Sequence, residues 1–432
     1  MDINRKTAYN TLLAVESRKA YSNIALNHQI RVSKPSSPAF VRELVYGVLE
    51  NKMLLDYVID QLIPRDVKKM RTSDIILLRI GIYQLAKMDA VPEYAAVNET
   101  VNLAKRYAKG REGFINRVLR EYIKQKYTVK LPDRSEDEVR YLSVKYSYEP
   151  WIIKLWLESY AVDFVEELLK AGNEKPKTAI RLNWLKVMKP DLIKKLEGKG
   201  FTVEEGTYSA NALYVTGENL IGTRAYKDGL FSIQDESSQM VAQMLDPKHG
   251  ETVMDVCAAP GGKTLAIAER MNNRGRVIAS DIYKRKLEIV DREAARLGIN
   301  IVETKNWDAT KVDSSMVGKA HKVLVDAPCT GLGVLRRKPE IKYKKLTAEM
   351  QDLPRKQLSI LQASSQYVKP GGILMYSTCT INPYENERVA SDFLRKDGSF
   401  SMMETKQLLP NINGTDGFFI CKMKKTDNLT EQ

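Results

Sequence analysis

The chain has 432 residues, of which 43% are hydrophobic, and a formal net charge of +14. This length indicates two or three domains, and the hydrophobic share is enough for packed cores, which excludes a wholly disordered chain. The excess of positive charge favours a polyanionic partner, most often nucleic acid, although many soluble proteins are basic without binding one.

Residues 1–127 read as all helical, because apolar residues recur at helical spacing in several stretches. One such stripe contains Val41, Leu44, Val45, Val48 and Leu49, and similar stripes run through residues 75–85 and 114–122. Residues 1–130 also hold 23 Lys and Arg against 13 Asp and Glu. We therefore predict a helical domain over residues 1–127 that meets RNA, although its basic side chains could equally form an ordinary solvated face.

Residues 128–231 change character twice. The polar stretch 128–140 contains a proline and reads as a linker, and residues 141–175 are again helical in pattern. From 176 to about 230, short strand-like runs alternate with turns, as in TAIRLNWLK, FTVEEG and ALYVTG. We predict linker helices followed by a small α+β subdomain that also binds RNA.

Residues 232–432 alternate between strand and helix patterns. The strand candidates are 252–256, 276–280, 299–303, 322–326, 372–377 and 417–424. Such alternation predicts a largely parallel, doubly wound α/β sheet. Taken with the preceding segments, the predicted fold class is multi-domain: an all-α first part, a small α+β middle part and a Rossmann-like last part.

Unusual residues follow most of the predicted strands. They are the run Cys257, Ala258, Ala259, Pro260, Gly261, Gly262 and Lys263, then Asp281, Trp307 with Asp308, Asp326 to Cys329, and Ser377 to Cys379. Ligands of open α/β sheets bind outside the carboxyl ends of the strands, so we expect these residues to gather at one edge.

The glycine turn after the first strand points to a nucleoside ligand. Gly261 and Gly262 allow the backbone to approach a ligand closely at a helix N-terminus. The phosphate-loop motif would need glycine where Cys257 stands, and the GxGxxG pattern is absent. Asp281 could accept hydrogen bonds from ribose hydroxyls, or could merely cap a helix. A ribose-bearing ligand without a polyphosphate fits, and S-adenosylmethionine is the commonest.

Two cysteines stand at neighbouring strand ends. Carbon 5 of cytosine is a poor nucleophile, but a thiolate that adds to carbon 6 makes it enamine-like and able to attack an electrophilic methyl group. Asp326, three residues before Cys329, is placed to stabilise such an adduct at N3. Spacing alone does not decide whether Cys329 or Cys379 is the nucleophile, and buried apolar cysteines are the alternative.

The segment 333–343, GVLRRKPEIKY, follows Cys329 directly. Arg336, Arg337 and Lys338 could grip phosphates beside the target base, although a bare charge run is usually a solvated face. Its place after an active strand end favours RNA contact.

The four cysteines form no CxxC pair, so a zinc ribbon and a bound metal are not expected. The start is polar without an apolar signal region, and the most apolar helical run, Ile75–Leu85, is interrupted by Arg79 and is too short to span a bilayer. A cytoplasmic chain with free thiols is therefore the expectation.

Three motifs resemble the RNA cytosine-C5 methyltransferases of the Nol1/Nop2/Sun type. They are DVCAAPGGKT (255–264), DAPCTGLGVLRRKPEIKY (326–343) and STCTINPYENE (377–387). ELVYGVLE (43–50), LLRIGIYQL (77–85) and FINRVLR (114–120) resemble a NusB-type RNA-binding bundle. The resemblance covers nearly the whole chain.

The resemblance implies a role for each matching position. Residues 257–263 would wrap the methionine part of S-adenosylmethionine, Asp281 would hold the ribose and Asp308 would lie near the adenine. Asp326 would contact the cytosine and the reacting centre, Cys379 would be the nucleophile, and Cys329 would promote release of the product. The fusion with a NusB-type bundle implies 16S ribosomal RNA as the partner, with cytosine 967 as the target. We expect the enzyme to be a monomer.

Three alternatives differ in class or substrate. A non-enzymatic RNA-binding factor is opposed by the cofactor turn and both thiols. A DNA cytosine methyltransferase classically carries Pro-Cys-Gln, whereas Thr330 follows Pro328-Cys329 here. The third alternative keeps the chemistry and moves it to transfer RNA or to another ribosomal site.

Overall fold

The computed structural model describes residues 2–63, 67–125 and 130–427, and its chain divides into two compact units. The first unit contains the residues up to Glu174 together with Leu335–Lys345, and the second contains Lys175–Val334 and the residues from Leu346 onward. The predicted boundary between residues 127 and 128 lies outside the described residues, and the division into three domains stays a prediction.

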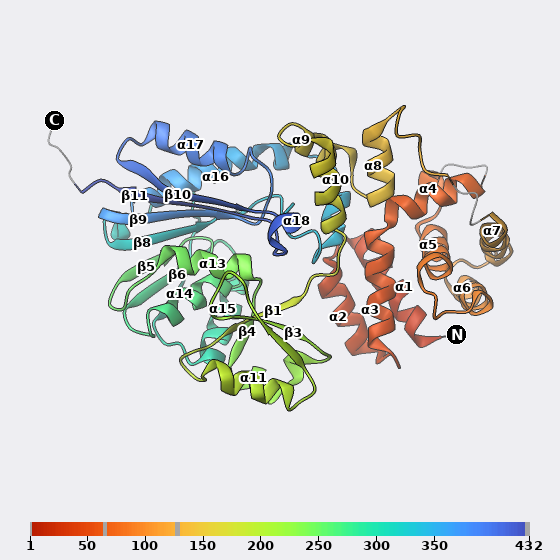
Figure 1. Cartoon of the computed structure of the whole chain (residues 1–432), viewed down its shortest axis with the longest axis horizontal. Coiled ribbons are helices and arrows are strands. Elements are labelled where there is room, and N and C mark those ends of the chain that lie inside the picture. Colours follow the sequence, from red (N-terminus) through yellow and green to blue (C-terminus); the bar gives the residue numbers. More distant parts are fainter. Residues whose placement is uncertain (1, 64–66, 126–129, 428–432) are drawn as a thin grey trace. The chain divides into compact units, whose positions relative to one another are not determined.

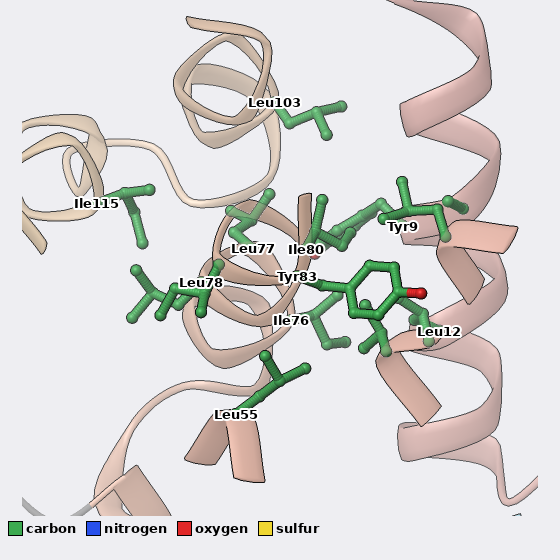
Figure 2. Close-up of a cluster of buried hydrophobic side chains, with 14 of the residues drawn as sticks. Tyr9, Leu12, Leu55, Ile76, Leu77, Leu78, Ile80, Tyr83, Leu103 and Ile115 are labelled. Carbon is green, nitrogen blue, oxygen red and sulfur yellow. The ribbon is translucent and has the colours of Figure 1, made fainter. Parts of the chain in front are cut away.

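The first unit is helical, as the apolar stripes predicted. Its elements are α1 (Ile3–Arg18), α2 (Ser22–Ser33), α3 (Pro38–Glu50), α4 (Lys52–Leu62), η1 (Val67–Lys69), α5 (Thr72–Lys87), α6 (Glu93–Tyr107), α7 (Glu112–Gln125), α8 (Glu138–Tyr146), α9 (Pro150–Leu157), α10 (Val162–Ala171) and η4 (Pro339–Tyr343). Helix α5 lies at the centre of the core, and its Leu77, Leu78 and Ile80 are fully buried among side chains of the surrounding helices (Figure 2). Burial of this apolar surface is the main force that holds the bundle together.

Arg79 interrupts the apolar run of α5 without breaking the helix. Its guanidinium contacts both carboxylate oxygens of Asp56, at 2.6 and 2.7 Å, and Glu16 at 2.9 Å. Burial lowers the pKa of Arg79, but the two carboxylates outweigh that effect and the net shift is upward. A buried cation is tolerated here because it is paired on both sides.

A short segment from late in the chain, Leu335–Lys345, packs inside the first unit. The carboxylate of Glu340 accepts hydrogen bonds from the backbone N–H (3.2 Å) and the hydroxyl (2.7 Å) of Ser22, at the start of α2. The Tyr343 hydroxyl donates to the carbonyl of Leu49. The chain therefore leaves the second unit after Val334 and returns to it at Leu346.

The second unit begins with a small antiparallel sheet. Its elements are β1 (Thr178–Leu182), α11 (Lys189–Glu197), β2 (Thr202–Glu205), β3 (Ala212–Thr216), η2 (Leu220–Gly222), α12 (Arg224–Lys227) and β4 (Phe231–Ile233), and its strand order is β2-β3-β1-β4. Residues such as Ile180, Leu192 and Leu213 form its own buried core. This is the α+β subdomain that the short strand patterns predicted.

A seven-stranded sheet in the order β10-β11-β9-β8-β5-β6-β7 completes the unit. Its elements are α13 (Glu236–Leu245), β5 (Thr252–Asp255), α14 (Gly262–Arg270), β6 (Arg276–Asp281), α15 (Lys284–Leu297), β7 (Val302–Asn306), η3 (Ser314–Met316), β8 (Ala320–Asp326), α16 (Ala348–Ser365), β9 (Val368–Thr378), α17 (Glu387–Lys396), β10 (Phe400–Leu408), α18 (Pro410–Asn413) and β11 (Phe418–Lys425). Strands β5 to β9 are parallel, and β11 pairs antiparallel with β9 and β10. The predicted doubly wound fold is confirmed.

Helices cover both faces of this sheet (Figure 1). Val323, Val325 and Tyr376 pack with α16 and α17, whereas Leu324 and Met375 pack with α13, α14 and α15. Successive strand residues thus enter opposite cores, which explains why these strands read as continuous apolar runs.

Several strands differ from the sequence prediction, among them β9, which begins at Val368 rather than at residue 372. Strand β7 begins at Val302 rather than at residue 299, and β10 was not predicted. Most of β10 is exposed, including Met402 and Met403 at the edge of the sheet, so it lacks the buried apolar run of its neighbours. Among the described residues, none of the helices has the length and apolar character needed to cross a membrane.

Candidate active site

The carboxyl ends of the parallel strands bring the predicted residues together at one edge of the sheet. The backbone N–H of Ala258, after β5, donates to the carbonyl of Ser280 at the end of β6 (2.9 Å). The N–H of Ala327, after β8, donates to the carbonyl of Ser377 at the end of β9 (2.9 Å). The loops that carry the turn, the aspartates and both cysteines are thus joined by backbone hydrogen bonds.

The two cysteine sulfurs lie 3.3 Å apart, within hydrogen-bond distance. Cys329 follows β8 and Cys379 follows β9, and β8 and β9 are adjacent parallel strands. Both cysteines are partly exposed, whereas Cys421 is fully buried in the core of β11. Two thiols that meet at a partly open strand end can act on one bound molecule.

Asp326, the last residue of β8, anchors a polar cluster beside the thiols. Its Oδ2 accepts from the ammonium of Lys263 at 2.7 Å, and its Oδ1 accepts from the Ser377 hydroxyl at 2.9 Å. Burial lowers the pKa of Lys263, but the Asp326 carboxylate outweighs it and the net shift is upward. Lys263 therefore carries a positive charge at neutral pH and presents a cation at the strand ends.

The two thiols differ in their surroundings. The hydrogen bond with Cys379 and then burial raise the pKa of the Cys329 thiol well above its usual value. The two sulfurs share a hydrogen bond in which either thiol can be the donor. An electrostatic interaction with Cys379 also contributes to the raised pKa of Lys263.

The turn between β5 and α14 is the predicted cradle for a ligand. Gly261 has φ +105° and precedes the first residue of α14, and an added Cβ would meet Val290 at 3.1 Å. Asp255 is fully buried; its Oδ2 accepts from the Thr264 hydroxyl, and its Oδ1 has no partner among the described residues. A buried acceptor with unused capacity fits a ligand that brings its own polar hydrogen.

Asp281 and Asp308 supply further acceptors. The two carboxylate oxygens of Asp281 accept from the N–H of Ala259 (3.2 Å) and of Tyr283 (2.9 Å). Asp281 thus shapes the turn and the start of α15, and a carboxylate retains further acceptor capacity for hydroxyl groups. Hydrogen bonds from Thr310 lower the pKa of Asp308, which therefore stays ionised. Together these residues fit an adenosyl ligand.

The predicted phosphate-binding run belongs to the Leu335–Lys345 segment of the first unit. Arg336 is buried, with 9% of its surface exposed, so little of its guanidinium can meet a phosphate. Arg337 and Lys338 are half-buried, and the Lys338 ammonium lies over the Tyr21 ring. Among the described residues, no group of three or more His, Cys, Asp or Glu side chains is arranged as metal ligands.

Sequence reasoning missed the ion pair of Lys263 with Asp326 and the buried carboxylate of Glu385. The sequence places Lys263 in the cofactor turn only. Its contact with Asp326 is not predicted, because this contact depends on β5 and β8 being adjacent in the sheet. Glu385 lies in the STCTINPYENE motif, in which the sequence predicts a role for Cys379 only. A buried acidic residue in a motif beside a reactive thiol is the signal that could have found it.

A doubly wound sheet with a glycine turn, aspartates and thiols at the carboxyl ends of its strands fits the class of S-adenosylmethionine-dependent methyltransferases. Comparison with known families specifies the kind. Residues 242–424 match the 16S rRNA methyltransferase RsmB/F model, residues 2–124 match the NusB family, and residues 148–221 match a ferredoxin-like domain of RsmF/B-like methyltransferases. The chain belongs to the RsmB/F family of 16S rRNA methyltransferases.

Relatives match over nearly their whole length. A probable ribosomal RNA small subunit methyltransferase B of Bacillus subtilis is 38% identical, and the match covers 98% of each chain. One from Synechocystis is 32% identical over 98% of this chain and 99% of its own. The crystal structure of PH0851 superimposes with a TM-score of 0.83 at 25% identity, over 97% of this chain and 98% of that one.

The chain is therefore an S-adenosylmethionine-dependent methyltransferase of small-subunit ribosomal RNA. This result excludes two of the three alternatives. The chain is neither a non-enzymatic RNA-binding factor nor a DNA cytosine methyltransferase.

Proposed function

We propose that this enzyme methylates carbon 5 of a cytosine in 16S ribosomal RNA through a covalent bond between Cys379 and carbon 6 of the base. The observation that carries the proposal is the thiol pair, 3.3 Å apart, beside the Lys263–Asp326 ion pair. Cytosine 967 is the proposed position, in line with the resemblance.

The first step is attack of the Cys379 thiolate on carbon 6. A cation beside a thiol favours the ionised sulfur, and Lys263 interacts electrostatically with Cys379, whose sulfur lies 3.3 Å from that of Cys329. Asp326 and Lys263 lie where they can contact the polar edge of the cytosine and balance the charge that develops on the ring. Carbon 5 then becomes enamine-like and nucleophilic.

When bound, S-adenosylmethionine supplies an electrophilic methyl group to carbon 5. Residues 257–263 would hold its methionine part, Asp281 its ribose, and Asp308 its adenine side, and the buried Asp255 would complete the cradle. After transfer, a base, either water or ionised Cys329, takes the proton of carbon 5, the electron pair of that C–H bond restores the double bond between carbons 5 and 6, and the bond to Cys379 breaks with its electron pair returning to the sulfur. Cys329, adjacent to the departing sulfur, assists this release.

The helical unit and the small α+β subdomain dock the RNA in this proposal, through phosphate contacts that weaken as salt rises. Arg337 and Lys338 are better exposed for such contacts than the buried Arg336. The target base leaves its stack to reach the strand ends. We place the reaction in the cytoplasm, where bacterial ribosomal RNA is found, and propose that a monomer performs it.

The test is nucleoside analysis of 16S rRNA fragments treated with the wild-type enzyme and with Cys379→Ala. We expect 5-methylcytidine only with the wild type, at a position then located by bisulfite sequencing. Methylation on another atom of the base, or full activity of Cys379→Ala, contradicts the proposal.

A further inference from the structure

The carboxylate of Glu385 is fully buried and gathers four hydrogen bonds from three parts of the catalytic unit. Its Oε2 accepts from the backbone N–H of Thr330 (2.9 Å) and from Nε2 of Gln357 (3.0 Å). Its Oε1 accepts from the Thr330 hydroxyl (2.5 Å) and from Nδ2 of Asn382 (2.8 Å). The sequence analysis predicted no contact between Glu385 and any of these partners.

These partners connect the two loops that carry the thiols. Thr330 directly follows Cys329, in the loop after β8, and Asn382 lies three residues after Cys379, in the loop after β9. Gln357 on α16 uses the same Nε2 to donate to the carbonyl of Pro328, at 2.9 Å. The carboxylate is thus the common acceptor that joins both loops to the helix behind them.

A second contact runs directly between the residues that follow the cysteines. The hydroxyls of Thr330 and Thr380 lie 2.8 Å apart. Because the Thr330 hydroxyl donates to Glu385, the Thr380 hydroxyl donates to Thr330. The chain of hydrogen bonds therefore runs from the loop of Cys379, through Thr330, to the buried carboxylate.

We propose that Glu385 is a positioning residue that holds the Cys329 and Cys379 sulfurs at working distance by tying the loop after β8 to the loop after β9. Its three partner residues donate all four hydrogen bonds, which suits a carboxylate, because a carboxylate only accepts. Glutamine has the same shape but would turn an NH2 group toward two of the donors. Glu385→Gln therefore sets the NH2 group against at least one fixed donor, an amide N–H, and weakens the connection without removing any volume.

The consequence concerns the release step more than the first attack. Cys379 stays on its own strand end when the connection is lost, whereas the loop of Cys329 loses its main polar anchor. The proposal rests on the proposed function here, because Cys329 acts on the departing sulfur. We therefore expect the covalent RNA adduct to persist longer in Glu385→Gln.

The first arm of the test measures thiol proximity without any RNA. Phenylarsine oxide condenses with two adjacent thiols, forms two As–S bonds and releases one water, with no change of oxidation state. We expect wild-type protein to bind one equivalent and Cys329→Ala to lose this binding. Glu385→Gln should bind at least about tenfold more weakly, since the sulfurs are no longer held together. Glu404→Gln, an exposed glutamate on β10, is the matched control and should behave as the wild type.

The second arm measures catalysis with the same variants. We expect Glu385→Gln to lower kcat by about 10- to 100-fold, with the KM for RNA and the Kd for S-adenosylmethionine within about twofold of the wild type. Thr330→Val, which removes the hydroxyl and keeps the backbone donor, should show a smaller loss of the same kind. It also carries the test if Glu385→Gln does not fold.

The two arms separate the two proposals. If arsenical binding and kcat are both unchanged in Glu385→Gln and Thr330→Val, the positioning role is refuted. If arsenical binding weakens while the wild type forms no 5-methylcytidine, the positioning role stands and the proposed reaction is wrong.

Discussion

Replacing the buried Asp255 by asparagine should stabilise the catalytic unit at neutral and alkaline pH. Burial raises the pKa of Asp255 from an ordinary value of 3.8 to about 7, despite the hydrogen bond from Thr264. Between these values the folded protein keeps a proton that the unfolded chain has lost, so stability falls as pH rises through this window. Above about pH 7 the carboxylate is ionised in both states, and the loss is complete.

The magnitude follows from the size of the shift. A rise of about three pKa units, at about 1.4 kcal/mol per unit, corresponds to about 4 kcal/mol. Asparagine cannot ionise and its side-chain oxygen can still accept from Thr264. The difference in free energy of unfolding between Asp255→Asn and wild type should therefore be small near pH 4 and grow to about 4 kcal/mol at pH 8.

Urea denaturation of the ligand-free protein at pH values from 4 to 8 measures this difference, with amide exchange of β5, β6 and β8 reporting on the catalytic unit. The exposed Asp191, changed to asparagine, is the control and should show no such trend. The cofactor affinity of Asp255→Asn should fall, because the cradle loses a carboxylate. A stability difference that stays constant over this pH range would refute the reasoning.

Three further changes test other parts of the account. Burial lowers the pKa of Lys342 to about 7, so between about pH 7 and 10 the Lys342 ammonium is protonated in the unfolded chain but not in the folded protein. The stability of the wild type should therefore rise over this pH range, and Lys342→Met should flatten the rise in a calorimetric pH series. An unchanged slope in Lys342→Met would argue against a neutral, buried Lys342. An added Cβ at Gly47 would lie 1.9 Å from the Tyr83 ring, so Gly47→Ala should lower the free energy of unfolding by about 1–3 kcal/mol and lower Tm. Gly113→Ala is the control and should not lower Tm, because an added Cβ there has no atom within 4 Å. Equal Tm values for the two variants would contradict this packing. Lys263→Met removes the cation of the active-site ion pair and should slow single-turnover methylation by about 100-fold at saturating cofactor, and an unaltered rate would exclude an electrostatic role for that lysine.

The sequence predicted the fold and the site best where residues with characteristic chemistry stand next to strands or helices that a periodic apolar pattern marks. Parallel strands carry their ligands at one end, so the positions of Asp326, Cys329 and Cys379 after predicted strands were enough to expect them at one edge. The structure brings their side chains together, with the sulfurs 3.3 Å apart. The apolar stripes of the first unit likewise marked helices whose inward faces are buried.

The remainder depended on tertiary contacts that no local pattern encodes. Strand β10 is exposed over most of its length and carries no apolar run to predict it. The basic run after Cys329 reads as a surface that meets phosphate, yet its Arg336 is buried and its neighbours pack within the helical unit. Glu385 is an ordinary acidic residue in sequence and becomes distinctive only when four donors converge on it.

The most direct test of the central claim is a trapping experiment with Cys329→Ala. Incubation with a 16S rRNA fragment and S-adenosylmethionine should leave the protein covalently attached to RNA, seen as a retarded band under denaturing conditions, with the modified peptide containing Cys379. Cys329→Ala together with Cys379→Ala should give no such band. Normal turnover by Cys329→Ala, or an adduct on a residue other than Cys379, would contradict the assignment of the two thiols.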